Sequence, residues 1–535
     1  MTESADLVLV GARVHTLDPG KPLATSLAIR DGRILAVGDR AEVTELCGAT
    51  TEIIDGDGLV VVPGLVDAHC HPLWGARAMR DADLTGLPDL AAACAVLADV
   101  AARTTDEWIC AHGLQREWFA DAPQGSILAE VVGNRPIFVS FRDGHGALAS
   151  PEALRRAGIS GPRTFGDASQ VVCDDNGRPT GELREPSAME AVRTHIPPLS
   201  AQRRLSLYRA QLDRMARLGL TGAHVMDDAP GDLDDLMTLE SDADLAVRLV
   251  IAIWLQPEMD DAQIADAFSR AGRAGRRWSS GAVKFFLDGV IDQGTAWLNS
   301  PDTQGEGRLA NWPDLDRYRE VVRRAIAHGL GCATHAIGDR AIREALSAYA
   351  QAGSASAHRP CRIEHVELCD PRDLGQFARE GVIASLQPIH IAAVANDPDH
   401  AWRDRLDRTR AQFGWPHADL LRAGATVALG SDWPVAVQDP RVGMAWARQH
   451  WAPGTAGPGY RDHQAISAHE ALIGYTQSAA RAVGDHVRGV IAPGMCADLT
   501  VFGADPLMSS ADEVPEIPVV MTIVDGCATY RASHV

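Results

Sequence analysis

Residues 60–72, VVVPGLVDAHCHP, form an apolar run that ends in two histidines one residue apart. A Pro-Gly pair interrupts the run, which predicts two separate strands, the second starting at Leu65. Side chains two residues apart in a strand point to the same side, so His69 and His71 can reach one metal ion. The stretch predicts the metal-binding end of a buried strand, and a strand with two ordinary core histidines is the alternative.

The composition is typical of a globular protein with a large domain and a smaller one, since 46% of the 535 residues are hydrophobic and 23% are charged. A net charge of -21 argues against nucleic acid or an anionic membrane as partner. The first ten residues lack the positive charge of a secretory signal, and no apolar run reaches the roughly 18 residues of a membrane span. The ten cysteines form no CxxC pair. We therefore expect a cytoplasmic protein that acts on a small molecule.

Both ends of the chain carry short strand-like segments separated by turns, many of them Asp-Gly. At the N-terminal end, over 6–54, this pattern predicts a small antiparallel β unit. Neither end has enough apolar surface to be stable alone. We therefore expect residues 1–63 and 488–535 to form one composite β-sandwich.

Between these ends, apolar strand candidates alternate with helical stretches, as in a parallel α/β fold. The eight candidates are 65–71, 221–227, 247–254, 282–288, 331–336, 361–366, 382–388 and 426–432. They predict a (β/α)8 barrel over 64–487, whose active site lies at the C-terminal ends of its strands. The roughly 150 residues after the first strand are too many for a simple crossover. A large insertion, a subdomain at about 75–200 with strands of its own, is expected there.

Lys284 is the second unusual feature, because the 50 basic residues are 48 arginines and only two lysines. Lys21 lies in a polar turn, whereas Lys284 lies inside the apolar run GAVKFFLDG. A buried lysine is costly unless its amine is neutralised or paired. An amine can form a carbamate, which a guanidinium cannot readily do. The sequence therefore favours a reacted or paired amine, and a chance lysine whose stem reaches toward solvent is the alternative.

Metal-binding side chains recur where the predicted strands end. The first strand ends in His69 and His71, the fourth carries Lys284, and the fifth, sixth and eighth end near His335, His365 and Asp432. Any one of them could be a capping or turn residue. Because the strand ends of a barrel meet at one face, their joint placement predicts a metal site.

These motifs resemble the amidohydrolase superfamily over nearly the whole chain. DAHCHP is similar to the HxH motif of the family's first strand, and Lys284, His335, His365 and Asp432 match its ligands on later strands. APGMCADLTVF resembles the family's closing strand. The segments DGHGALAS, HAIGDRA, RIEHVEL, QPIH and GSDWPV resemble the branch that includes N-substituted formamide deformylase.

The resemblance implies a binuclear metal centre with two divalent ions, for which zinc suits the imidazole and oxygen ligands. The implied ligands are His69 and His71 on one ion, His335 and His365 on the other, carbamylated Lys284 as the bridge, and Asp432 beside it. Asp432 is then expected to take a proton from the metal-activated water and to pass it to the leaving nitrogen. Iron, manganese or nickel in place of zinc, and a single-metal site, are the alternatives.

Further residues are expected to contact the substrate. His145, in the GHG of the insertion, matches a position in the family pattern that implies a catalytic contact with the substrate carbonyl. Polar contacts are expected from Gln387 and His390 after the seventh strand and from Glu182 in GELRE. Trp74 and Trp433 follow metal-binding motifs and are candidates to wall an apolar pocket.

We expect a hydrolase that cleaves the C–N bond of a small neutral amide or formamide with an apolar N-substituent, in a homodimer as is common for barrels of this family. One alternative is a deaminase of a heterocycle, which typically uses one metal and a glutamate after the fifth strand, where this chain has AIGDR. An ester or lactone hydrolase is a second alternative. A scaffold without catalysis is disfavoured because all six ligand positions are filled.

Overall fold

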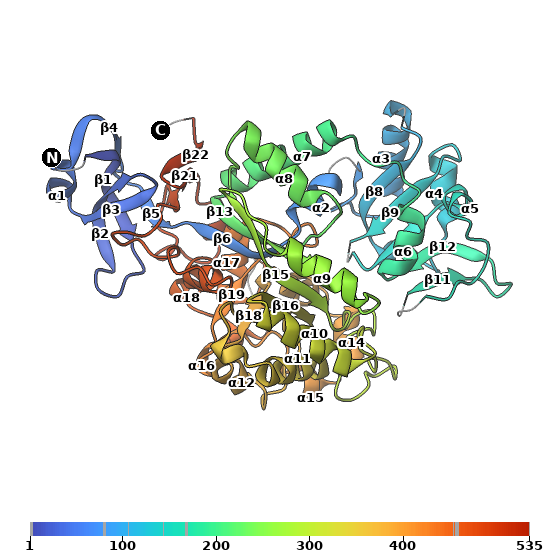
Figure 1. Cartoon of the computed structure of the whole chain (residues 1–535). Coiled ribbons are helices and arrows are strands. Elements are labelled where there is room, and N and C mark those ends of the chain that lie inside the picture. Colours follow the sequence, from blue (N-terminus) through green and yellow to red (C-terminus); the bar gives the residue numbers. More distant parts are fainter. Residues whose placement is uncertain are drawn as a thin grey trace. The chain divides into compact units, whose positions relative to one another are not determined.

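The computed structural model describes residues 4–78, 82–104, 106–142, 144–165, 169–452, 454 and 460–533. The chain forms two compact units, one of Met1–Pro72 with Arg209–Val535 and one of Leu73–Tyr208. The first unit holds the barrel and a sheet built from both chain ends, and the second holds a mixed sheet of its own (Figure 1). Among the described residues, no helix is both long enough and apolar enough to cross a membrane.

The barrel consists of eight parallel strands that lie side by side in chain order. They are β6 (Leu65–Cys70), β13 (Leu220–Val225), β14 (Arg248–Trp254), β15 (Trp278–Phe286), β16 (Gly331–Ala336), β17 (Arg362–His365), β18 (Ile383–Leu386) and β19 (Val427–Leu429). Strand β6 and the segment that follows β19 bring the ring together, because the amide of Asp432 donates to the carbonyl of His69 at 2.7 Å. The predicted (β/α)8 barrel is confirmed.

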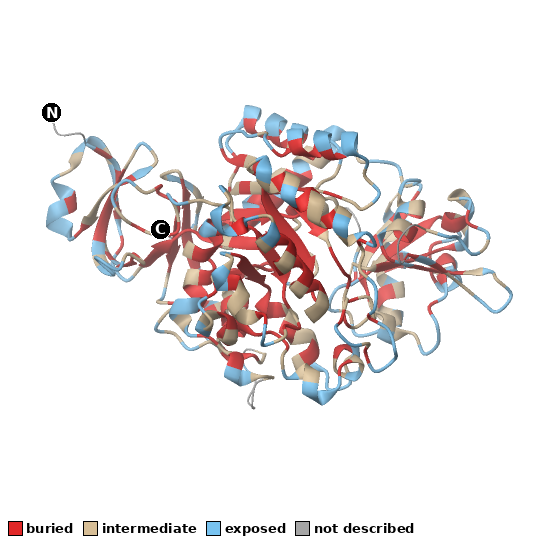
Figure 2. Cartoon of the chain, turned by 60° about the horizontal axis from the view of Figure 1, so that its bottom comes forward, coloured by how far each residue is buried: buried red, intermediate tan, exposed pale blue. Residues whose placement is uncertain are grey.

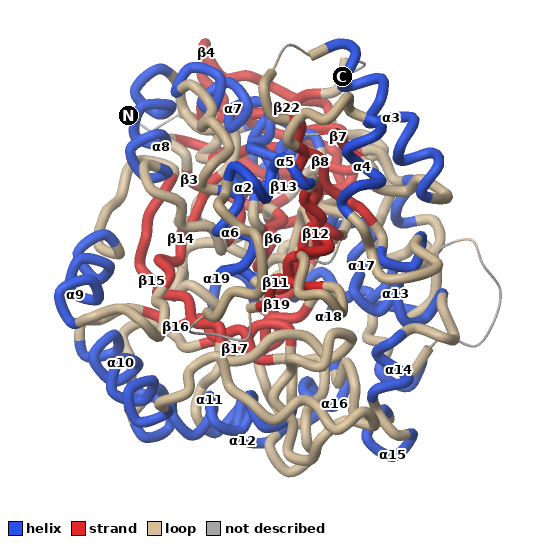
Figure 3. Tube along the Cα trace, turned by 90° about the vertical axis from the view of Figure 1, so that its right-hand side faces the viewer, coloured by secondary structure: helices blue, strands red, loops and turns tan. Residues whose placement is uncertain are grey.

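Helices cover the outside of the barrel, so its strands are buried (Figure 2). The helices of this unit that follow β13 are α8 (Asp232–Asp242), α9 (Asp261–Arg270), α10 (Leu315–Ala327), α11 (Asp339–Gln351), α12 (Leu374–Arg379), α13 (Ile391–Asn396), α14 (Ala401–Arg405), α15 (Arg408–Ala411), α16 (His417–Arg422), α17 (Pro440–Gln449), α18 (Ala468–Gly474) and α19 (Gln477–Arg481). Figure 3 shows α9, α10 and α11 along the outside of β14, β15 and β16.

Helix α10 illustrates why these segments are helical. Asp314 accepts hydrogen bonds from the first backbone amides and caps the N-terminus. The buried residues Tyr318, Val321, Val322 and Ala325 recur at a spacing of three or four and form one apolar face. The helix ends before Gly329, whose φ of 75° is a left-handed conformation that glycine adopts without steric penalty.

The two chain ends share one eight-stranded sheet, which confirms the expected composite unit. Its strands are β22 (Cys527–Arg531), β21 (Val519–Val524), β20 (Leu499–Phe502), β5 (Val60–Pro63), β1 (Ala5–His15), β2 (Leu23–Arg30) and β3 (Arg33–Gly38), with β4 (Cys47–Asp55) paired to β1. Strand β5 joins the ends by pairing antiparallel with β20, and both ends contribute to one apolar core. The predicted antiparallel pairing at 6–54 is confirmed for β1, β2 and β3 and is wrong for β4, which runs parallel to β1, as β5 also does. Helix α1 (Arg40–Thr44) lies in the crossover between β3 and β4, and this crossover lets β4 run in the same direction as β3 and β1.

The second unit is the insertion expected after the first barrel strand. Its sheet has the order β11 (Gln170–Cys173), β12 (Pro179–Arg184), β10 (Gly146–Ala149), β9 (Ile137–Phe141), β8 (Ile109–Leu114) and β7 (Ala82–Asp83). Its helices are α3 (Leu90–Arg103), α4 (Gly125–Val131), α5 (Pro151–Arg156) and α6 (Pro186–Arg193). Helices α2 (Pro72–Ala78) and α7 (Ala201–Arg217) lie where the chain passes between the units. Strands β11 and β12 form an antiparallel hairpin.

Candidate metal centre

His69 and His71, at the end of the first barrel strand, both face Asp432, which follows β19. Nε2 of His69 and Nε2 of His71 each lie 3.3 Å from Oδ1 of Asp432. Side chains two residues apart lie on one side of an extended chain, which is why both imidazoles reach the same oxygen. One ligand atom from each of the three residues lies within 4.8 Å of the others, a spacing suited to one metal ion.

A carboxylate holds the far side of each of these imidazoles. Nδ1 of His69 lies 2.6 Å from Oε2 of Glu364, and Nδ1 of His71 lies 2.9 Å from Oδ1 of Asp227. An ionised carboxylate can only accept a hydrogen bond, so we assign a proton to Nδ1 of each imidazole. Each Nε2 is then the nitrogen that a metal ion beside Asp432 would bind in place of a second proton, as in metal-binding histidines backed by a carboxylate.

His365 and His390 form a second group with Asp432, again within 4.8 Å. His390 lies in a short 3₁₀ turn, η3 (Pro388–His390), and its Nε2 lies 3.5 Å from Oδ2 of Asp432. The rings of His365 and His390 are stacked, with centroids 6.1 Å apart. Nδ1 of His365 is buried and has no hydrogen-bond partner within the part of the chain that the structure describes. A buried nitrogen of this kind is destabilising unless a ligand satisfies it.

His335 lies beside this second group. Its ring centroid is 4.4 Å from that of His365. Its Nε2 is 3.1 Å from the carbonyl oxygen of Gly289 and 3.8 Å from Oδ1 of Asp288. The structure therefore brings His335 next to the other histidines, while its role as a ligand stays a prediction.

Lys284 is fully buried in β15, and its Nζ lies 5.0 Å from the centroid of the Phe286 ring. Burial lowers the pKa of its amine to about 8, although the negative charges of Glu364 and Asp432 oppose this shift. An amine with this pKa is partly neutral near physiological pH, which a reaction with CO2 requires. The carbamate itself stays a prediction.

Two residues of the site have a left-handed backbone, His365 with a φ of 75° and Asp432 with a φ of 60°. Such a conformation costs about 1–3 kcal/mol for residues other than glycine and persists where the surroundings impose it. It also interrupts the alternation of β17, so two successive residues reach His69. Glu364 contacts Nδ1 of His69, and the ring of His365 lies 4.8 Å from the ring of His69.

Electrostatics keep the carboxylate of Asp432 ionised. Burial alone would raise the pKa of Asp432, but the charge and hydrogen bond of His69 and the hydrogen bond of His71 hold it well below its usual range. Burial likewise opposes protonation of His71, yet its hydrogen bonds to Asp227 and Asp432 outweigh burial and raise the pKa of His71 to about 9. The site is thus arranged to favour a positive charge next to Asp432.

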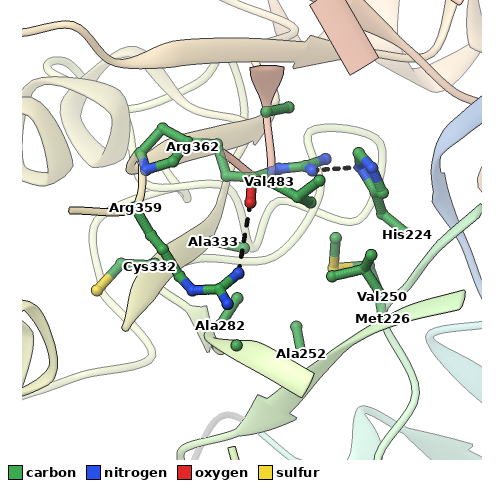
Figure 4. Close-up of a pocket in the computed structure, with 14 residues that line it drawn as sticks. His224, Met226, Val250, Ala252, Ala282, Cys332, Ala333, Arg359, Arg362 and Val483 are labelled. Carbon is green, nitrogen blue, oxygen red and sulfur yellow. Dashed lines mark hydrogen bonds between the residues drawn. The ribbon is translucent and has the colours of Figure 1, made fainter. Parts of the chain in front are cut away.

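Arg362 supports Glu364 from inside the barrel. Its Nε donates to Oε1 of Glu364 at 2.5 Å and its Nη2 to Oε2 at 2.9 Å, while Nη1 donates to Nδ1 of His224 at 2.8 Å. Figure 4 shows Arg362 and His224 at the wall of a small pocket lined mainly by small and apolar residues. Burial would raise the pKa of Glu364, but the charges of Arg362 and His69 hold it well below its usual range.

Sequence reasoning missed the two carboxylates behind the histidines. Asp227 is the last residue of the second predicted strand, TGAHVMD, and Glu364 stands next to His365 in RIEHVE. An acid at the end of a barrel strand lies at the same level as the histidines at the other strand ends. That placement was the available signal for Asp227, whereas Glu364 is revealed only by the left-handed turn at His365.

Gln387 and Trp433 follow β18 and β19 in the same unit. Gln387 is buried, its Nε2 donates to the carbonyl of Ser385 at 3.5 Å, and its Oε1 has no hydrogen-bond partner among the described residues. Trp433 is also buried, and the guanidinium of Arg214 in α7 lies 5.5 Å from its ring centroid. Trp433 therefore packs against α7, and the substrate contacts expected of both residues stay predictions.

His145, Glu182 and Trp74 lie in the second unit. Nδ1 of His145 is 3.2 Å from Oε2 of Glu185. Glu182 is buried and accepts hydrogen bonds from two arginines of its own unit, which neutralise its charge. Trp74 lies in α2. The contacts of these three residues with a substrate stay predictions.

Comparison with known proteins agrees with this geometry. Residues 52–530 match the model of the Amidohydrolase family. The chain is 29% identical to Protein LONG AFTER FAR-RED 3 of Arabidopsis thaliana, over 98% of this chain and 92% of that protein, and 27% identical to N-substituted formamide deformylase of Arthrobacter pascens, over 99% of each. A solved structure of an uncharacterized metal-dependent hydrolase from Pyrococcus horikoshii OT3 shares the fold, with a TM-score of 0.76 and 23% identity over 94% of this chain and 99% of that one. The chain therefore belongs to the amidohydrolase family, as the motifs of its sequence predicted.

Proposed function

We propose that this protein is a metal-dependent hydrolase that cleaves the C–N bond of a small neutral amide or formamide with an apolar N-substituent. One observation carries the proposal: His69 and His71 turn Nε2 toward Oδ1 of Asp432 while a carboxylate holds each Nδ1. Imidazole nitrogen and carboxylate oxygen are ligands that suit zinc.

A divalent ion held by His69, His71 and Asp432 would supply an activated water and polarise the carbonyl of the substrate. Asp432 is suited to move the proton, because its carboxylate is ionised and lies 3.3 Å from Nε2 of both His69 and His71, where the ion and its water would be held. It accepts a proton from the attacking water and delivers it to the leaving nitrogen. Amide nitrogen is a poor leaving group until it is protonated, so this delivery is the step that suits the site to C–N cleavage.

The proposal includes a second divalent ion, linked to the first by carbamylated Lys284. In support, the amine of Lys284 is fully buried, and its surroundings lower its pKa to about 8. A carbamate would give this position a negative charge, which two neighbouring cations require and which a free ammonium lacks. His365, with a buried nitrogen that has no hydrogen-bond partner in the described chain, is the first candidate ligand for that ion.

The similarity to N-substituted formamide deformylase extends over nearly the full length of both proteins and supports a formamide as substrate. Trp74 and Trp433 are the candidates to contact an apolar N-substituent. His145 is the candidate to hold the substrate carbonyl. These assignments make the formyl or acyl group, rather than the N-substituent, the part that faces the metal centre.

Hydrolysis of a substrate panel tests this function. Zinc-loaded and chelator-treated protein would be assayed with N-alkyl and N-aryl formamides, acetamides, esters, lactones and heterocyclic amines. We expect the zinc-loaded protein to release amine and carboxylate from formamides or amides. Release of ammonia from the heterocycles alone would indicate a deaminase, and cleavage of the esters or lactones alone would indicate an ester or lactone hydrolase.

A further inference from the structure

We propose that the pocket of Figure 4 binds a short-chain monocarboxylate of the size of acetate or propionate, with the carboxylate held by Arg359 and the alkyl group inside the pocket. The inference concerns a site apart from the candidate metal centre and does not depend on the proposed function.

The pocket lies at the end of the barrel opposite to the histidines. Its walls include Gly331 and Arg362, which are the first residues of β16 and β17. His335 lies four residues after Gly331 in β16, which corresponds to about 13 Å along a strand. Arg359, in the segment before β17, and Val483, which follows α19, are partly exposed and form the rim. A ligand in this pocket therefore enters from the N-terminal ends of the strands.

The guanidinium of Arg359 supplies a positive charge at this rim. Its Nη1 donates to the carbonyl of Val483 at 3.4 Å, and no carboxylate among the described residues pairs with it. A guanidinium that is half-buried and faces no anion is poorly compensated for the water that it has lost. A carboxylate fits its planar fork through two parallel hydrogen bonds. The rim thus offers a binding position for a carboxylate.

The inner end of the pocket adds no further unbalanced charge. Arg362 donates to both oxygens of Glu364, at 2.5 and 2.9 Å, so the two charges compensate each other. Nδ1 of His224 accepts a hydrogen bond from Arg362 at 2.8 Å, and burial together with the charge of Arg362 holds the pKa of His224 well below its usual range. His224 is therefore neutral. One positive charge, that of Arg359, favours a monoanion over a more highly charged anion.

The walls suit a short apolar tail. Most of the other lining residues are small or apolar, among them Val250, Ala282 and Ala333. The centre of a water-sized molecule can move through about 20 Å³ of the pocket, and about 10–15 Å³ of such space holds one water. One or two carbon atoms beyond a carboxylate at the rim therefore fit, whereas the chain of hexanoate is too long.

Gly281 allows Arg359 to lie at the pocket. A Cβ at position 281 would lie 2.6 Å from both Cζ and Nη1 of Arg359, which is closer than real Cβ contacts. Gly281→Ala would therefore push the flexible end of Arg359 aside while leaving its charge in the protein. This variant separates the position of the guanidinium from its presence.

Calorimetric titration of the full-length, zinc-loaded protein with propionate tests the inference. We expect saturable binding of one equivalent, weakened about 10-fold or more in Arg359→Ala because a hydrogen-bonded charge is lost. Gly281→Ala should also bind more weakly. The matched control is Arg379→Ala, which removes an exposed arginine of α12 and should bind propionate as the wild type does. Thermal melting of each variant shows that folded proteins are compared.

Further titrations distinguish this pocket from the metal centre, because a carboxylate can also bind a metal ion. Chelator-treated protein and Asp432→Ala should both bind propionate with the affinity of the wild type. Acetate should bind as well, whereas hexanoate and inorganic phosphate should bind at least about 10-fold more weakly, as they exceed the room of the pocket or its single charge.

Three results would overturn the inference. The first is an absence of saturable propionate binding to the wild type. The second is propionate binding that is equally strong in Arg359→Ala and Gly281→Ala, or that is lost with the metal or in Asp432→Ala. The third is a preference for phosphate or hexanoate over propionate. Because no titration measures hydrolysis, each of these results leaves the proposed function to its own test.

Discussion

Nδ1 of His71 lies 2.9 Å from Oδ1 of Asp227. The two residues follow the C-terminal ends of neighbouring barrel strands, β6 and β13, which pair in parallel. Asp227 therefore fixes both the orientation of the imidazole and the nitrogen that carries its proton. Asp227 thereby leaves Nε2 as the nitrogen that would bind a metal ion.

Removal of that contact should weaken metal binding. Asp227→Asn keeps the shape of the side chain but loses the charge that favours a proton on Nδ1, so the metal affinity should fall about 10- to 100-fold. Competition with a chromophoric chelator measures the metal affinity of each variant. Asp228→Asn is the matched control, because Asp228 binds Arg270 and the amide of Trp254 and should leave the affinity unchanged. Equal affinities in both variants would show that Asp227 does not position His71.

Replacement of Lys284 tests the proposed carbamate. Lys284→Arg keeps a positive charge where a bridging anion is proposed, so it should lose the two-metal site and nearly all activity. Lys284→Ala should be partly rescued by bicarbonate together with short-chain carboxylates. Wild-type protein grown with ¹³C-bicarbonate should give a carbamate carbon signal. A free amine in a fully active, metal-loaded protein would exclude the bridge.

His145→Ala tests the role expected for the insertion. If His145 contacts the substrate carbonyl, loss of its imidazole should lower kcat/KM by about 100-fold while the bound metal stays constant. His112→Ala, which alters a half-buried histidine of the same unit, should retain kcat/KM. An unchanged kcat/KM in His145→Ala would make its contact with Glu185 purely structural.

Two buried histidines outside the candidate metal centre, His417 and His450, should make the free energy of unfolding depend on pH. The rings of His417 and His450 are 5.3 Å apart, and their Nδ1 atoms donate to the carbonyls of Trp415 and Tyr460 at 3.1 Å each. Burial lowers the pKa of His417 to about 4, and burial together with the charge of His417 lowers the pKa of His450 to about 3.

An unfolded histidine binds its proton near pH 6.5, so between that pH and about 4 the unfolded state binds more protons than the folded state. The free energy of unfolding should therefore fall as the pH decreases below about 6.5, by about 2 kcal/mol per histidine at pH 5. Urea unfolding at pH 7.5 and pH 5 measures the fall, which should be smaller in His417→Leu. An identical pH dependence in the two proteins would contradict this assignment.

The barrel could be predicted from the sequence because each strand is an apolar run that ends at a polar residue. Residues 331–336, GCATHA, are the predicted fifth strand and also the observed bounds of β16. The same pattern placed His69, His71 and Asp432 at strand ends, and the closed ring brings them together. The apolar runs and the polar residues that end them therefore predicted both the fold and the first three candidate ligands.

The local sequence pattern could not predict features that depend on the backbone conformation of single residues or on contacts between segments far apart in the chain. The positive φ of His365 places two successive residues at the site, where alternation predicts only one. The position of His390 depends on a 3₁₀ turn after β18, and its closeness to Asp432 joins residues from two different strand ends. The parallel pairing of β4 with β1 likewise depends on a crossover that Asp-Gly turns do not reveal.

The most direct test of the account is the zinc dependence of hydrolysis by chelator-treated protein, with the substrate that the panel identifies. We predict no turnover without metal, recovery in proportion to the zinc bound, and a loss of several orders of magnitude in Asp432→Ala even with excess zinc, because Asp432 both binds metal and transfers the proton. Full turnover by protein shown to contain no metal, or by Asp432→Ala, would contradict the proposed hydrolase.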